Sequence, residues 1–82
     1  MLTDPNYNPG NLLDRAAEKL GVINDRQLAM RIGTSAPRLS RIRNKGLPVS
    51  GGILICLNEI TGMAIADMRE LAGLPRRMYI TQ

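Results

Sequence analysis

The fold is decided by residues 25–44, which read DRQLAMRIGTSAPRLSRIRN. Gly33 divides this stretch, because glycine readily takes the positive φ that ends a helix and opens a tight turn. Ser35 follows as a good N-cap, whose side-chain oxygen can accept a hydrogen bond from the first turn of a second helix. The stretch therefore predicts two short helices, over 25–32 and over 36 to about 45, joined by a turn of about three residues.

Apolar residues on each side of the turn indicate how the two helices pack. Ala29 is small enough to let the helices cross closely. Leu39 and Ile42 form an i, i+3 pair that buries one side of the second helix and leaves the other side free. Asn24 and Gln27 have the spacing of a capping box at the start of the first helix. Together these features are typical of a helix-turn-helix.

Three more helices are expected around this pair. One begins with Pro9 at its first position and runs to Leu20, where Gly21 ends it. Another, over about 51–61, is the most apolar of the set and is expected to be the central helix of the core. The last is amphipathic and covers 65–72. We therefore expect an all-α domain of five helices.

The chain divides into an arm over residues 1–8, a helical domain over 9–73 and a tail over 74–82. Eighty-two residues are enough for one domain with one modest core. The arm is rich in Pro and Asn and is expected to be loosely held. The tail has two interpretations, a strand that pairs two subunits or an end that folds onto its own core, and both depend on Met78, Tyr79 and Ile80.

Positive charge is concentrated in one part of the chain. The formal net charge is +4, and residues 26–58 contain six basic residues and no acidic one. A basic segment of this kind attracts phosphate and speeds encounter with nucleic acid. Because the chain has no Phe or Trp and only two tyrosines, stacking on single-stranded bases is not expected.

Several classes of function are disfavoured. The chain has no histidine, no metal-ligand spacing and no phosphate-binding glycine loop, so we expect neither catalysis nor a metal, cofactor or small-molecule site. Without a recognisable signal peptide or membrane span, a cytoplasmic location is expected. Cys56 lies within an apolar run and is expected to pack as a small hydrophobe. The core is also expected to hold Met30, Met63 and Met68.

Three separate segments, in the correct order, resemble the lambda repressor and Cro-like (XRE) family of DNA-binding domains. They are residues 25–29 (DRQLA), 40–46 (SRIRNKG) and 61–68 (TGMAIADM), the last similar to the junction between the family's fourth and fifth helices. The resemblance spans Leu12 to Leu71. It implies a five-helix domain whose second and third helices form a helix-turn-helix and whose third helix reads the major groove.

Four residues depart from the usual pattern of that family. Asp25 stands where a phosphate-contacting Gln is usual, so that contact is expected to be missing, with Gln27 compensating. Thr34 replaces an aliphatic turn residue. Arg43 replaces a frequent Glu, which makes the nearby surface more basic. Ala64 replaces a Ser or Thr cap and leaves the fifth helix less well started.

The outward side of the second helix of the motif is the candidate DNA-reading face. At about 100° per residue, it lies opposite Leu39 and Ile42. The family's use of the first two turns implies base contacts by Ala36, Pro37, Ser40 and Arg41. Arg41 is the best candidate, because two N–H groups of its guanidinium can donate to guanine O6 and N7 at the same time. Phosphate contacts are expected from Gln27, Ser35, Arg38, Arg43, Asn44 and Lys45.

The resemblance implies a transcriptional regulator that occupies an operator and blocks polymerase, as Cro and small phage or mobile-element repressors do. Since one short helix makes few base contacts, a homodimer on a palindromic double-stranded operator is expected. Two alternatives stay open. The chain could be an antitoxin that represses its own operon while masking a toxin, or a helix-turn-helix that meets only an acidic protein partner.

Overall fold

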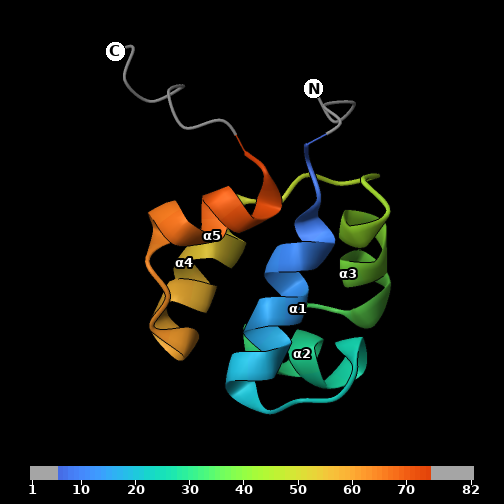
Figure 1. Ribbon diagram of the computed structural model, residues 1–82. Helices are drawn as coiled ribbons and strands as arrows, with labels where there is room; N and C mark the ends of the chain where they lie inside the picture. Colours follow the sequence, from blue (N-terminus) through green and yellow to red (C-terminus); the bar gives the residue numbers. More distant parts are fainter. Residues whose placement is uncertain (1–5, 75–82) are drawn as a thin grey trace.

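Five helices make up the part of the chain that the computed structural model describes, residues 6–74 (Figure 1). No strand occurs among these residues, so the predicted all-α class is confirmed. The strand and pairing residues predicted at 78–80 lie outside the described residues. The bounds of the helices are Pro9–Leu20 (α1), Asp25–Ile32 (α2), Ala36–Arg43 (α3), Gly51–Thr61 (α4) and Ile65–Ala72 (α5).

Helices α2, α3 and α4 begin where a local side chain accepts a hydrogen bond from a free backbone N–H group, whereas the Asn8 side chain makes no such bond at the start of α1. The Asn24 side-chain oxygen accepts a hydrogen bond from the Gln27 N–H (2.9 Å). The Gln27 side-chain oxygen in turn accepts one from the Ile23 N–H (3.1 Å), one residue earlier than in a standard capping box. Ser35 caps α3 through the same kind of bond. Ala64 supplies no side-chain cap to α5, as expected from its sequence.

The central helix is α1. It packs against all four other helices, whereas α4 contacts only α1, α2 and α5 (Figure 1). Leu12, Leu13 and Ala16 place the inner face of α1 in the core, where they are fully buried. The prediction that α4 is central is therefore wrong. Its apolar run does not face inward throughout, since Ile55 is 55% exposed.

Residues 6–8 lie against the end of α5 rather than in a loose arm. The Tyr7 ring is only 3% exposed, and the Asn8 N–H donates a hydrogen bond to the carbonyl oxygen of Ala72 (2.8 Å). The predicted arm over 1–8 thus needs correction at its end, because Tyr7 supplies apolar surface that the end of α5 covers. Residues 1–5 lie outside the described residues.

The methionines and the cysteine divide between core and surface. Met63 and Met68 are buried, as predicted, but Met30 is 76% exposed and the prediction for it is wrong. Met30 lies on the side of α2 opposite the buried Leu28, so the core does not reach it. Cys56 is half-buried, and its S–H donates to the carbonyl oxygen of Ile32 (3.4 Å).

Candidate nucleic-acid interface

A three-residue turn, 33–35, joins α2 to α3. Gly33 has φ +87°, and its N–H and that of Thr34 both donate to the carbonyl oxygen of Ala29 (2.8 and 2.9 Å). This left-handed glycine closes α2 and reverses the chain within one residue. On α3, Leu39 and Ile42 are buried in the core. One side of α3 is therefore fixed to the domain.

The other side of α3 is open. Pro37, Ser40 and Arg41 are exposed, and so is Asn44 directly after the helix, whereas Ala36 is half-buried. The structure thus places the predicted base-contacting residues on one face, with Ala36 at its edge. Side chains on this face can meet a flat or grooved partner without moving the core.

Polar and basic residues flank this face. Arg38 and Lys45 are exposed. Gln27 and Ser35 are exposed too, although their side-chain oxygens accept the cap hydrogen bonds of α2 and α3. The Gln27 amide N–H₂ and the Ser35 hydroxyl hydrogen keep their capacity to donate. These four residues of the predicted phosphate set are therefore exposed and able to donate, Gln27 on α2 and the other three on or next to α3.

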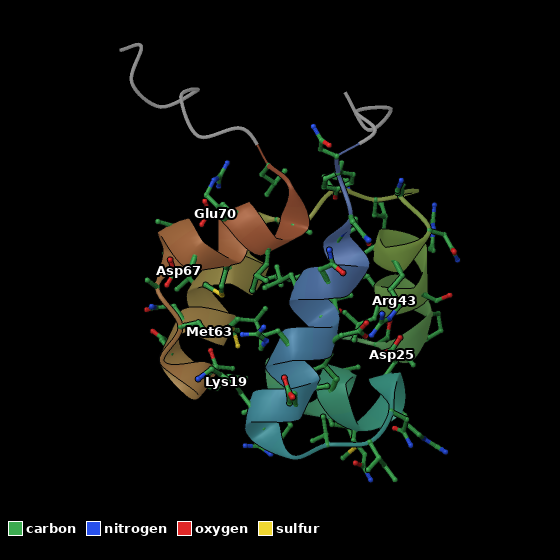
Figure 2. The ribbon with its side chains drawn as sticks, viewed as in Figure 1. Lys19, Asp25, Arg43, Met63, Asp67 and Glu70 are labelled. Atoms are coloured by element: carbon green, nitrogen blue, oxygen red, sulfur yellow. The ribbon has the colours of Figure 1, made fainter. Side chains whose placement is uncertain are left out.

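Arg43 has a different position. Its Nε and Nη2 donate to the two carboxylate oxygens of Asp25 (2.8 and 2.9 Å), and its Nη1 lies 2.9 Å from Asp14 on α1. Figure 2 shows Arg43 beside Asp25, between α3 and α1. The hydrogen bonds to Asp25, then those to Asp14, raise the pKa of Arg43 above its ordinary value against the opposing effect of burial. The guanidinium is thus paired with two carboxylates, and the Arg43 side chain is 29% exposed.

Sequence reasoning noted Asp25 and Arg43 as two separate departures from the family pattern and missed that they pair. Asp14 was not singled out at all. The available signal was that the two unusual residues at 25 and 43 have opposite charges, as a compensating pair would. The partner on α1 had no such signal, because only the tertiary packing brings Asp14 to Arg43.

The end of α3 lies two residues before the predicted one. Asn44 follows the last helical residue, and Lys45, rather than Gly46, takes the left-handed conformation, with φ +66°. The Gly46 N–H then donates to the carbonyl oxygen of Arg41 (2.8 Å). A lysine in this region of φ is strained by roughly 1–2 kcal/mol relative to glycine. The lysine is therefore held at this site at a cost in stability.

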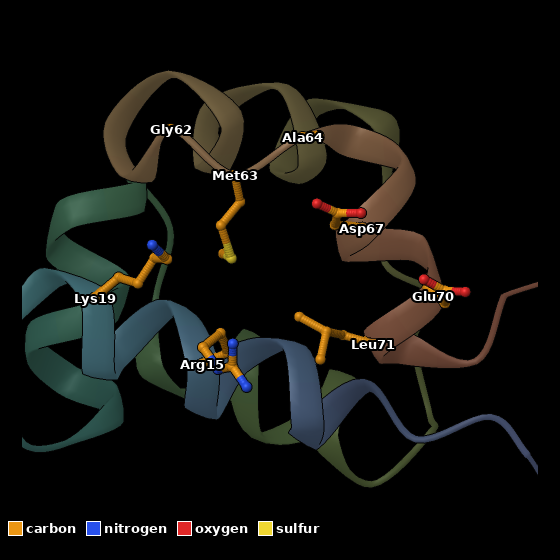
Figure 3. A pocket seen from close by; sticks show the side chains of 8 residues that line it. All are labelled: Arg15, Lys19, Gly62, Met63, Ala64, Asp67, Glu70 and Leu71. Carbon is orange, nitrogen blue, oxygen red and sulfur yellow. The ribbon is translucent and has the colours of Figure 1, made fainter.

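A pocket of about 560 Å³ lies between α1 and α5, away from α3 (Figure 3). Arg15 and Lys19 line its α1 side, and Asp67 and Glu70 line its α5 side. It includes none of the predicted contact residues. Among residues 6–74, no group of three or more His, Cys, Asp or Glu side chains could hold a metal ion.

No helix among the described residues is, by itself, long and apolar enough to cross a membrane. Only α4 and α5 taken together meet that test of length and composition, and they are bent by 120° at their junction.

Comparisons with protein-family models, with curated proteins and with solved structures found no match to this chain.

Proposed function

We propose that this chain binds duplex DNA in a sequence-dependent manner and regulates transcription by occupying an operator, as members of the lambda repressor and Cro-like family do. One observation supports this most directly. Leu39 and Ile42 fix α3 to the domain, while Ser40 and Arg41 are exposed on its outward face. A rigid helix with a polar outward face has the size and shape to enter a major groove.

The proposed contacts divide into two kinds. Ala36, Pro37, Ser40 and Arg41 lie along the helix face that would meet base edges, with Arg41 reading guanine through its fork. Ala36 and Pro37 have no side-chain donors and can pack only on thymine methyl groups. The backbone of the duplex would be held by Gln27, Ser35, Arg38, Asn44 and Lys45. We leave Arg43 out of this set, because three of its five N–H groups are already directed at the carboxylates of Asp14 and Asp25.

A homodimer on a palindromic site is part of the proposal. A single α3 offers few base contacts, and two copies related by a two-fold axis would read two half-sites about one helical turn apart. Occupancy of a promoter by such a dimer excludes polymerase without any catalytic step.

The deciding experiment is a fluorescence anisotropy titration of the protein against duplex DNA from its own promoter region and against a shuffled duplex. Both are measured at low and at near-physiological salt. A preference of roughly a thousandfold for the promoter that survives added salt is expected. Equal binding to the two duplexes, lost as salt rises, would contradict sequence-specific regulation.

A protein-interaction role is the second candidate. Ile23, just before α2, and Met30, within it, are 83% and 76% exposed, and the exposed Arg26 and Arg31 lie in the same stretch of chain. Exposed apolar residues beside positive charge fit an acidic protein partner better than they fit DNA. Failure of the protein to bind either duplex would favour this reading.

Lys45 offers a test of the phosphate contacts. Lys45→Gly is expected to raise the free energy of unfolding by about 1 kcal/mol, because glycine relieves the positive φ. The same change is expected to weaken binding to every duplex and to flatten the salt dependence by about one unit of slope, since a phosphate contact is lost. Urea denaturation and titrations at several salt concentrations measure the two effects.

Lys45→Ala is the matched control, because it removes the charge and keeps a side chain at positive φ. It should flatten the slope equally without stabilising the fold. A slope that neither change alters would show that Lys45 is only a solvated surface charge.

A further inference from the structure

Arg43 ties three helices together. It extends from the last position of α3 to Asp25 at the first position of α2 and to Asp14 in the middle of α1. Gly10, in the first turn of α1, also lies beside the guanidinium. A Cβ atom at position 10 would be in ordinary van der Waals contact with Arg43 Nη1, at 3.4 Å.

The cluster is also negative. Two carboxylates surround one guanidinium, and no other charged side chain forms an ion pair with them among the described residues. The side chain of Asp14 is 71% exposed, so its charge faces solvent on this flank of α3. On the far flank Arg38 is exposed, with Arg41 on the outward face. The two flanks of one helix therefore have opposite local charge.

We propose that the Asp14–Arg43–Asp25 cluster positions α3 on α1 and α2, and that its net negative charge keeps the DNA backbone on the Arg38 and Lys45 side of the helix. Arg43 is then a positioning residue and touches no DNA. The second half of this inference rests on the proposed function; the first half does not.

The geometry explains why phosphate would not take the guanidinium. Arg43 already directs three of its five N–H groups at carboxylates, two of them at a single carboxylate in the paired geometry that arginine favours, so only two N–H groups remain for a phosphate oxygen. A phosphate oxygen there would also approach the exposed Asp14 carboxylate, which repels it. Arg38 and Lys45 impose neither penalty.

Urea denaturation tests the positioning half without DNA. In a double-mutant cycle of Asp25→Asn and Arg43→Met, we expect a coupling of about fivefold in the unfolding equilibrium constant. The control cycle, Arg15→Met with Glu18→Gln, removes an exposed i, i+3 pair and should give about twofold or less. Equal coupling in the two cycles would overturn the positioning role. Should Arg43→Met fail to fold, Arg43→Lys replaces it, since it keeps the charge and loses only the paired geometry.

Titrations with a shuffled duplex test the second half of the proposal, that the negative charge of the cluster keeps the DNA backbone on one side of α3. Asp14→Asn is expected to tighten binding about threefold at low salt, because it removes repulsion close to the backbone path. Asp67→Asn on α5 changes the net charge equally and should alter affinity far less. Arg43→Met should leave the salt slope unchanged, and Arg43→Gln replaces it should it fail to fold, since this change also removes the charge.

Two results would overturn this second half of the proposal. One is a slope reduced by about one unit in Arg43→Met, which would make Arg43 a phosphate contact. The other is an equal change in DNA affinity in Asp14→Asn and Asp67→Asn, which would show that only the net charge of the protein matters. If the unaltered protein binds no duplex, the proposed function and the second half of this proposal fail together. The denaturation cycle still decides whether Arg43 positions α3.

Discussion

Gly73→Ala is expected to lower the free energy of unfolding by about 2–5 kcal/mol, the largest effect of any surface substitution considered for this protein. Gly73 has φ +75°, where an L side chain is strained by roughly 1–2 kcal/mol. A Cβ atom there would also overlap the carbonyl oxygen of Asn6 and lie 2.7 Å from its carbonyl carbon. These are backbone atoms, so a side-chain rotation cannot relieve the overlap. Urea denaturation followed by circular dichroism measures the loss.

Gly21→Ala is the matched control. Gly21 ends α1 with nearly the same backbone conformation, φ +71°, but a Cβ atom at this position would meet nothing within 4 Å. Its loss should be about 1–2 kcal/mol from the strain in φ alone. The difference between the two variants isolates the contact of residues 6–8 with the end of α5. Equal losses would show that this contact is absent in solution.

Arg41→Ala is expected to reduce the preference for an operator over random DNA by about 1–3 kcal/mol, or roughly 5- to 150-fold. Arg41 is exposed on the outward face of α3, opposite the buried Leu39 and Ile42. Loss of a bidentate contact to guanine removes discrimination between bases as well as affinity. The measurement is a pair of anisotropy titrations, with operator and shuffled duplex, at one salt concentration.

Arg15→Ala is the control for the loss of one arginine. Arg15 is exposed on α1, where it pairs with Glu18 and lines the pocket toward α5. It should lower the affinity for both duplexes slightly and equally. If Arg41→Ala also weakens the two duplexes by the same factor, Arg41 contacts only phosphate and the base-reading role is wrong.

The predictions that succeeded are those that depend on neighbours in sequence. The start and end of α2 follow from Asn24, Gln27 and Gly33, all within nine residues of one another, and the cap bonds form between residues three or four apart. The outward face of α3 follows from the period of the helix and from Leu39 and Ile42 alone. These signals need no knowledge of the rest of the fold.

The predictions that failed concern residues whose surroundings come from elsewhere in the chain. The hydropathy of α4 did not reveal that α1 lies at the centre, since burial depends on how many other helices pack against an element. Met30 is apolar yet exposed, because none of the helices in residues 6–74 covers its side of α2. Tyr7, in a stretch with the composition of a loose arm, is buried, and the backbone of residues 6–8 lies against the end of α5.

The amino-acid sequence by itself determined the five helices, the caps at Asn24 and Ser35 and the face that α3 turns away from the core, because these follow from hydrogen bonds and periodicity within a few residues. Only the tertiary structure decided what Arg43 does. Its partners Asp14 and Asp25 are 29 and 18 residues away along the chain. An arginine near a basic helix face can donate to phosphate or to carboxylate, and packing decides which acceptor lies within reach.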